Sequence, residues 1–143
     1  MNNIKASELW RVSEASFEFG SPWSINQFED DLKNQSSNWL VERNEEQEII
    51  AFLQYRVMFD EAELFNLAVI PSYWSNGLGQ KLFNQLTSAL LGANVSQLFL
   101  EVRESNQRAR LFYQKNGMVE VSKRKHYYHH PVENGLILMK EIK

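Results

Sequence analysis

The sequence predicts a single α/β domain in which helices cover a mixed β-sheet. Two apolar segments in the first half, residues 39–43 and 49–57, flank a short polar stretch and are typical of a β-hairpin. In the second half, apolar strand-like segments alternate with helical patterns, which favours a partly parallel sheet. The 143 residues contain no internal repeat and no linker, so we expect one domain over residues 1–143.

The first half of the chain is expected to contain two helices and three strands. Residues 6–17 form the first predicted helix, and a second helix runs to Leu32 with Ser24 as its N-cap. Residues 44–48 form the polar turn of the hairpin, and a third strand covers residues 62–69.

The second half is expected to add two helices and three strands. Apolar residues fall largely on one helical stripe at Leu78, Leu82, Phe83, Leu86 and Leu90, before Gly92. The remaining elements are a strand over residues 96–102, a helix over 106–115, and closing strands over 118–127 and 135–142. Asn116-Gly117 ends the second of these helices, because glycine readily adopts the positive φ of a helix stop.

The composition excludes several classes of protein. The net charge of -3 gives no support for nucleic acid as a partner. The chain has no cysteine, which excludes disulfides, a thiol nucleophile and cysteine-based metal sites. The N-terminus lacks the apolar region of a secretion signal, and no apolar run approaches the roughly 20 residues needed to span a bilayer. We therefore expect a soluble cytoplasmic protein that does not contact a membrane.

A glycine turn separates an apolar segment from a helical pattern. Gly77-Leu78-Gly79 follows the apolar residues 64–69. A P-loop would continue with Lys-Ser or Lys-Thr, and a dinucleotide-binding fingerprint would have a third glycine at Leu82, so both motifs are excluded. The turn is then either a phosphate-binding loop at a helix N-terminus, where free N–H groups and the helix dipole favour an anion, or only a strand-to-helix connection.

Glu101 interrupts the apolar strand predicted over residues 96–102. Strand alternation places its side chain on the face opposite Leu100 and Val102. In a sheet covered on both faces, the carboxylate enters a semi-buried cleft, where desolvation raises its pKa toward that of a general base. The alternative is a solvated glutamate that pairs with Arg103.

Tyr113 follows Glu101 by twelve residues, on the predicted helix 106–115. It is either an ordinary core tyrosine or a phenol that protonates a leaving thiolate. A phenol with a pKa of about 10 is a suitable acid for a thiol with a pKa of about 8.5. Asn106 opens this helix, either as a simple N-cap or as a cap that also reaches a ligand amide.

The histidines near the C-terminus do not form a metal-binding motif. His126, His129 and His130 surround Tyr127-Tyr128 in a predicted strand-to-loop segment and lack His-Glu-x-x-His spacing, so we expect no metal. We instead interpret this segment as one side of a binding site for a peptide substrate, with Tyr127 and Tyr128 forming its walls. The basic run 123–125 is interpreted as a solvated strand edge.

These signals together make the chain resemble the GNAT superfamily of acetyl-CoA-dependent N-acetyltransferases over nearly its whole length. Within it, the chain is similar to the RimI-like enzymes, which acetylate the N-terminal alanine of a ribosomal protein. The glycine motif indicates only the superfamily, whereas Leu-Glu-Val-Arg, Ser-Asn and the tyrosine at this spacing are more specific. The matching segments are Pro22-Trp23-Ser24, Leu64-Phe65-Asn66-Leu67-Ala68-Val69, Gly77-Leu78-Gly79, Leu100-Glu101-Val102-Arg103, Ser105-Asn106, Leu111-Phe112-Tyr113 and Tyr127-Tyr128.

The resemblance implies acetyl-CoA as co-substrate, no metal, and a twisted mixed sheet that splays open at its middle to admit the cofactor. It also implies that Glu101 removes a proton from the incoming amine, that Tyr113 protonates the departing CoA sulfur, and that Asn106 contacts the cofactor. The backbone of Leu67, Ala68 and Val69 would hold the pantetheine arm and polarise the thioester carbonyl. The pyrophosphate would bind at the loop of Ser75, Asn76, Gly77, Leu78, Gly79 and Gln80.

Two positions depart from the family pattern. Relatives usually have arginine or glutamine three positions before the first glycine of the loop, where this chain has Trp74. Relatives often have an acidic residue before the last apolar strand, where this chain reads Glu133-Asn134-Gly135. The first departure removes one polar contact to the cofactor, and the second bears on the choice of acceptor peptide.

The expected acceptor is a protein α-amine, that of the N-terminal alanine of the eighteenth protein of the small ribosomal subunit. Deprotonating an amine of pKa about 8 at pH 7 costs about 1.4 kcal/mol, against roughly 4.6 kcal/mol for a lysine side chain. The alternatives are a small amine, such as a polyamine or an aminoglycoside, and a non-catalytic acyl-CoA-binding module. The presence of both Glu101 and Tyr113 argues against the binding module.

Overall fold

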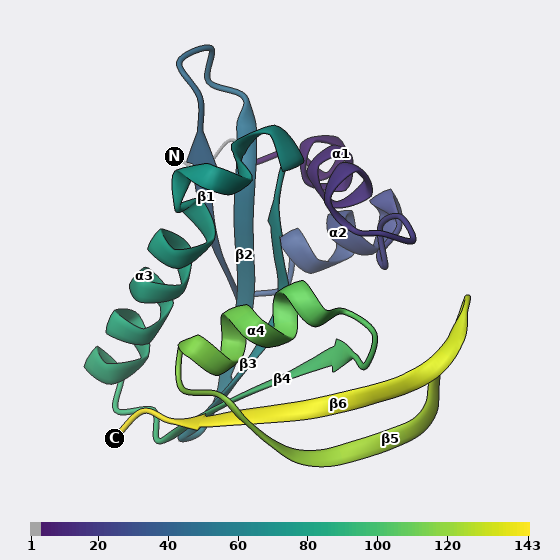
Figure 1. Ribbon diagram of the computed structural model, residues 1–143. Helices are drawn as coiled ribbons and strands as arrows, with labels where there is room; N and C mark the ends of the chain where they lie inside the picture. The colour runs from purple at the N-terminus through teal and green to yellow at the C-terminus, as the bar shows by residue number, and fades with distance from the viewer. Residues whose placement is uncertain (1–3) are drawn as a thin grey trace.

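The computed structural model describes residues 4–143 as a six-stranded sheet with α1 and α2 on one face and α3 and α4 on the other (Figure 1). The strand order is β1-β2-β3-β4-β6-β5, and β3 with β4 is the parallel pair. The elements are α1 Ala6–Ser16, α2 Ile25–Leu32, β1 Ser37–Arg43, β2 Ile49–Met58, β3 Glu61–Val69, the 3₁₀ helix η1 Pro71–Asn76, α3 Leu78–Gly92, β4 Gln97–Arg103, α4 Gln107–Lys115, β5 Val119–His129 and β6 Val132–Glu141. The predicted mixed α/β fold is confirmed.

Short sequence signals fix the helix ends as predicted. The Ser24 hydroxyl accepts a hydrogen bond from the Gln27 N–H at 3.1 Å, and the Gln27 side chain accepts one from the Ser24 N–H at 2.8 Å. This reciprocal capping box starts α2. At the end of α4, Gly117 adopts a φ of 88°, in the left-handed region that glycine populates without strain.

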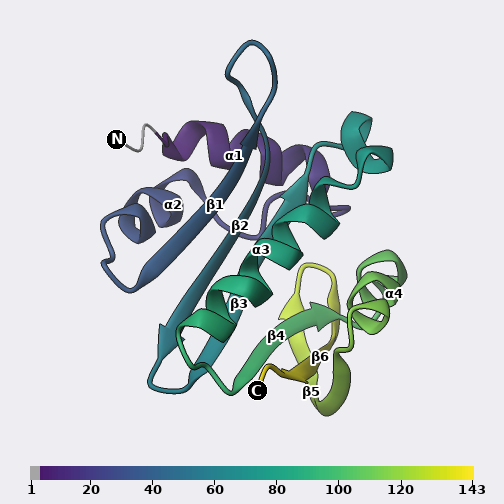
Figure 2. The same cartoon turned by 90° about the vertical axis from the view of Figure 1, so that its left-hand side faces the viewer.

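The sheet opens between β3 and β4. Parallel pairing joins Glu61–Leu64 of β3 to Gln97–Leu100 of β4 and covers only the first part of each strand. Beyond it, β4 turns away from β3 and continues beside β6, with which it pairs along its whole length (Figures 1 and 2). The predicted splayed sheet is therefore present.

A β-bulge lies where the opening begins. In the β2–β3 ladder, Gln54 is opposite Asn66 but Tyr55 is opposite Leu64, so Phe65 is an extra residue in β3. An extra residue bends its strand and interrupts the ladder. The bulge also reverses the alternation of β3, because Leu64 packs in the core under α3 whereas Ala68 packs in the core under α1.

Two hydrophobic cores lie on opposite faces of the sheet. The larger core joins both halves of the chain, with Leu53, Leu64, Leu86, Leu100 and Leu136 among its buried members. The smaller core lies beneath α1 and α2, where the rings of Phe28 and Phe52 meet edge to face with centroids 5.8 Å apart. Both faces of the central strands are therefore covered.

A buried polar network ties α2 to the bulge. Asp31 is almost fully buried and accepts hydrogen bonds from Gln54 and from Arg56. The Asn66 side chain donates to the side-chain amide oxygen of Gln54 at 2.7 Å. These contacts cross from α2 through β2 to β3 and satisfy polar groups that would otherwise be costly to bury.

The C-terminal hairpin and the glycine region differ in detail from the predictions. Residues 126–129, expected as a strand-to-loop segment, belong to β5, and β6 begins at Val132, because cross-strand pairing continues through Tyr128–Glu133 and His129–Val132. The connection before Gly77 is the 3₁₀ helix η1. Over residues 4–143, no helix is both long enough and apolar enough to cross a membrane.

Candidate active site

The edge of β3 that faces the opening carries backbone groups without a strand partner. The Ile70 N–H donates to the Ile50 carbonyl at 2.9 Å, so Ile70 and Ile50 form a hydrogen-bonded pair across β3 and β2. Hydrogen-bonded and non-bonded pairs alternate in an antiparallel ladder, so the backbone groups of Leu67 and Val69 point away from β2, toward β4. Those of Ala68 point toward β2, and its side chain lies in the smaller core. Leu67 thus offers both backbone groups to an extended ligand in the opening. Val69 offers its N–H, because its carbonyl accepts hydrogen bonds from Ser16 and Trp74.

The glycine turn starts α3 with free N–H groups. Gly77 has a φ of 73° and joins η1 to α3 without a side-chain cap. The Lys81 N–H bonds the Gly77 carbonyl at 3.0 Å as the first helical hydrogen bond, so the N–H groups of Leu78, Gly79 and Gln80 precede the helical ladder. Such a helix start favours an anion.

Three elements converge at Gly79. A Cβ placed on this residue would lie 3.9 Å from both the Phe112 ring and the Val69 side chain. The first turn of α3, the middle of α4 and the end of β3 are therefore in close proximity. This junction lies beside the free N–H groups at the start of α3.

Glu101 is the first residue of β4 beyond the last β3–β4 pair, Leu64–Leu100. Its neighbours Leu100 and Val102 lie in the larger core, so its side chain points to the opposite face, as the alternation predicted. One carboxylate oxygen is 3.3 Å from Arg124, and the other is buried without a hydrogen-bond partner. Glu101 pairs with Arg124 and not with Arg103.

The surroundings of Glu101 favour a proton acceptor. Burial raises the pKa of Glu101, the Arg124 guanidinium lowers it in part, and the carboxylate of Glu63 raises it again. Gly135 makes room for the carboxylate, since a Cβ there would lie 2.8 Å from its unpartnered oxygen and 3.3 Å from the Tyr128 ring. A buried, unpartnered oxygen on a carboxylate with a raised pKa is suited to general-base chemistry.

Tyr113 lies on the other face of the sheet, in the larger core. Its ring packs against Phe112 and Phe83, with centroids 5.3 and 6.2 Å away. Burial raises the pKa of Tyr113, so the phenol stays protonated at neutral pH and is able to act only as a donor. Glu101 and Tyr113 therefore lie on opposite faces of the sheet.

Arg103 fixes the wall beside Glu101. Its guanidinium donates to the carbonyl oxygens of His130 and Pro131 and to the Glu133 carboxylate, each at 3.0–3.1 Å. The same group stacks on Tyr128 at 4.3 Å and on Phe19, from the α1–α2 loop, at 5.0 Å. Arg103 thus joins β4, the hairpin and the α1–α2 loop.

Two further residues, Asn106 and Glu133, fix the start of α4 and the loop before it. Asn106 is the N-cap of α4 and accepts a hydrogen bond from the Ala109 N–H at 3.1 Å, as predicted. Glu133 belongs to residues 133–135, one of the two places where the sequence differs from the family pattern. It also accepts hydrogen bonds from the backbone N–H and the hydroxyl of Ser105, both at 3.0 Å. Glu133, the second residue of β6, therefore holds the loop that leads to Asn106.

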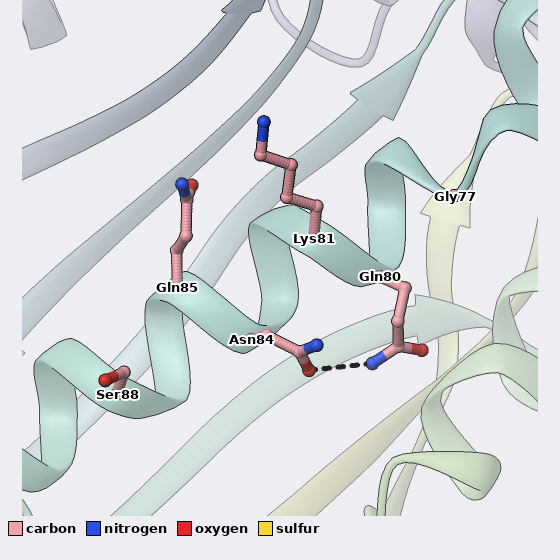
Figure 3. Close-up of a pocket in the computed structure, with 6 residues that line it drawn as sticks. All are labelled: Gly77, Gln80, Lys81, Asn84, Gln85 and Ser88. Carbon is pink, nitrogen blue, oxygen red and sulfur yellow. Dashed lines mark hydrogen bonds between the residues drawn. The ribbon is translucent and has the colours of Figure 1, made fainter.

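A hollow lined largely by residues with polar side chains runs along α3 from the glycine turn (Figure 3). Lys81 and Gln85 lie on one side of the helix, and Gln80 and Asn84 lie on the other. The Gln80 side chain hydrogen-bonds Asn84 at 2.9 Å and Asn116 at 2.6 Å. This hollow is open and does not include Glu101 or Tyr113, so the reactive groups lie elsewhere.

Comparison with known proteins identifies the family. The model of the Acetyltransferase (GNAT) family matches residues 6–118. The chain belongs to the GNAT family. Over 121 residues it is 39% identical to the [ribosomal protein bS18]-alanine N-acetyltransferase of Haemophilus influenzae, covering 82% of this chain and 80% of that protein. The predicted resemblance and the prediction of an N-acetyltransferase are confirmed.

Solved structures of GNAT proteins share the fold. The ribosomal-protein-S18-alanine N-acetyltransferase from Escherichia coli superposes with a TM-score of 0.87 at 29% identity, over 100% of this chain and 91% of that one. The PaiA N-acetyltransferase from Thermoplasma acidophilum, solved with coenzyme A, gives a TM-score of 0.74 at 17% identity, over 98% and 96% of the two chains. The second likeness shows the fold alone.

Within this GNAT fold, the residues predicted for the site lie on β3, at the start of α3, on β4 and on α4. Leu67 and Val69 follow the paired part of β3, and Glu101 follows the paired part of β4. Ser75 and Asn76 are exposed in η1 and hydrogen-bond each other at 3.4 Å. No cluster of three or more metal-binding side chains occurs in the described chain.

Sequence reasoning missed two charged residues beside Glu101. Arg124 belongs to the basic run interpreted as a solvated edge, and Glu63 carried no motif. Both residues influence the pKa of Glu101. The register of β3 against β4 places Glu63 opposite Phe99, so Glu63 shares a sheet face with Glu101. A prediction of that register would have indicated Glu63.

Proposed function

We propose that this protein transfers the acetyl group of acetyl-CoA to the N-terminal α-amine of a protein, namely the N-terminal alanine of ribosomal protein bS18. The observation that carries the chemistry is the position of Glu101, the first residue of β4 past its pairing with β3, with a buried unpartnered oxygen. The acceptor follows from the names of relatives such as the Haemophilus influenzae enzyme, and the cofactor from the family.

The reaction uses a residue from each face of the sheet. Glu101 takes a proton from the α-ammonium group, directly or through a water molecule, and the neutral amine attacks the thioester carbonyl. The C–S bond breaks, and Tyr113 donates its proton to the CoA thiolate. The nitrogen releases its second proton to solvent, from which the Tyr113 phenolate regains a proton. The products are the acetylated amine and CoA. No metal takes part in these steps.

Backbone groups supply the cofactor site. The N–H groups of Leu67 and Val69 bind the pantetheine arm and polarise the thioester carbonyl, as in strand addition by an extended ligand. The N–H groups of Leu78, Gly79 and Gln80 bind the diphosphate. Asn106 contacts the pantetheine arm from the start of α4.

An acetylation assay tests this proposal. The protein is incubated with acetyl-CoA and a peptide of the first residues of bS18, the same peptide already acetylated, or spermidine, and products are followed by mass spectrometry. We expect one added acetyl group on the free α-amine and none on the blocked peptide. Equal or faster acetylation of spermidine would contradict a protein acceptor.

A further inference from the structure

An arginine and a tryptophan stack across the mouth of the proposed cofactor site. The guanidinium carbon of Arg108, on the first turn of α4, lies 3.6 Å from the centroid of the Trp74 ring in η1. The Trp74 indole N–H donates to the Val69 carbonyl at 2.7 Å. The indole is therefore fixed to the end of β3, and the guanidinium rests on a fixed surface.

The stack lies beside the start of α3. Arg108 and Phe112 are four residues apart and share one face of α4. Phe112 is on the face that approaches Gly79, as the 3.9 Å spacing from a Cβ at Gly79 shows. The Arg108 guanidinium rests on Trp74 of η1, the element that leads directly into the turn where the N–H groups of α3 are free.

The charge of Arg108 has no counterpart in the part of the chain that the structure describes. Within residues 4–143, no carboxylate forms an ion pair with it. The first turns of α3 and α4 contain no acidic residue. The dipole of α4 opposes a cation on its first turn, so Arg108 gains no compensation from its own helix. Its unpaired guanidinium and the free N–H groups at the start of α3 both favour an anion.

We propose that Arg108, held on the Trp74 ring, binds the diphosphate of acetyl-CoA. This inference rests on the proposed function. It assigns a role to Trp74, which stands where relatives usually have arginine or glutamine: the indole supports a cation supplied from α4. Arg108 contributes to binding of the nucleotide end and takes no part in acetyl transfer.

Cofactor binding by charge-deleted variants tests this inference. Acetyl-CoA affinity is measured by titration calorimetry for the wild type, Arg108→Ala, Arg108→Gln and Lys115→Ala. Lys115 is an exposed basic residue at the other end of the same helix and serves as the matched control. We expect both Arg108 variants to bind acetyl-CoA at least about tenfold more weakly and Lys115→Ala to bind within about twofold of the wild type.

A truncated donor shows where Arg108 acts. S-acetylpantetheine lacks the diphosphate, so its kcat/KM should be the same for the wild type and both Arg108 variants. The inference is overturned if the Arg108 variants bind acetyl-CoA as tightly as the wild type, or if they lose as much activity with S-acetylpantetheine as with acetyl-CoA. A wild type that does not bind acetyl-CoA would instead overturn the proposed function. Melting temperatures of the two variants identify any that is unfolded.

Discussion

At the scale of single residues, the carboxylate of Glu101 lies between an arginine and a second glutamate. Arg124 contacts one of its oxygens at 3.3 Å, and the negative charge of Glu63 raises its pKa. The Glu101 side chain is only 17% exposed, and these two neighbours have opposite effects on its pKa. Removing either neighbour should therefore shift the pKa of Glu101 in a known direction.

Glu101→Gln should abolish most turnover without loss of the fold. We expect kcat to fall roughly 10²–10⁴-fold, because the amide cannot accept the proton. The folded-state pKa of Glu101 is raised, so the ionised carboxylate lowers stability at pH values above that pKa, and the neutral amide removes this cost. Steady-state kinetics and a thermal melt at pH 8 check both parts. Unchanged kcat would remove Glu101 from the mechanism.

Arg124→Gln and Glu63→Gln should move the pH profile in opposite directions. Activity rises as Glu101 loses its proton, so the acidic limb of kcat/KM against pH follows the pKa of Glu101. Loss of Arg124 removes an influence that lowers this pKa and shifts the limb to higher pH. Loss of Glu63 removes one that raises it and shifts the limb to lower pH. Shifts of the same sign in both variants would contradict this assignment.

The period of a β-strand was sufficient to predict the face of Glu101, but not its partner. Alternation within residues 98–102 is a local property. The contact with Arg124 depends on which residues of β5 and β6 pair, and that register shifts between Arg124 and Tyr128. Such a shift has no clear signal in the sequence. The interpretation of the basic run as a solvated strand edge is confirmed, because β5 is an edge strand and residues 123–125 are exposed. It gave no indication that Arg124 also contacts Glu101.

At the scale of elements, the β5–β6 hairpin is attached to the site through Arg103. Its guanidinium bonds two hairpin carbonyls and Glu133 and stacks on Tyr128. A lysine cannot reproduce this planar set of contacts. We expect Arg103→Lys to lower kcat/KM for the acceptor peptide about tenfold and to leave acetyl-CoA affinity within about twofold. An equal loss for both substrates would show a general structural role.

The network under the bulge should contribute strongly to stability. Asp31→Ala removes the acceptor for Gln54 and Arg56 and leaves buried polar groups unpaired. We expect a loss of about 2–4 kcal/mol in the free energy of unfolding. Asp30→Ala, at the exposed neighbouring position, should change it by less than about 0.5 kcal/mol. Urea denaturation of both variants distinguishes the network from a general effect on α2.

Elements with strong local signals were predicted well, and connections were predicted less well. The Ser24 capping box and Gly117 act within a few residues, so α2 and the end of α4 match. The 3₁₀ helix η1 and the extension of β5 to His129 depend on contacts with other elements. For the same reason, the sequence indicated that Trp74 was unusual but gave no indication that Arg108 stacks on it.

At the scale of the whole molecule, two parts of the sheet meet through one short ladder. Strands β1 to β3 lie on one side of the opening and β4 to β6 on the other (Figure 1), joined by pairing from Leu64–Leu100 back to Glu61–Gln97. The larger core spans this junction. The mixed sheet could be predicted from the order of strands and helices, whereas its opening was expected only from the family resemblance.

A ligand that bridges the two parts should stabilise the whole protein. At acetyl-CoA concentrations of 100 times Kd, we expect a gain of about 2.7 kcal/mol in the free energy of unfolding, or roughly 5–10 °C in Tm. Hydrogen exchange should slow at the N–H groups of Leu67 and Val69 and in the first turn of α3. Protection confined to the outer face of α3 would contradict binding in the opening.

The most direct measurement is a crystal structure with a bisubstrate analogue in which CoA is joined to the α-amine of the bS18 peptide. We predict that the pantetheine arm lies between β3 and β4, with the Tyr113 hydroxyl within hydrogen-bond reach of the sulfur. On the opposite side, Glu101 should reach the acceptor nitrogen directly or through one water molecule. An analogue bound outside this opening, or with Glu101 and Tyr113 out of reach of the reacting atoms, would contradict the proposed mechanism.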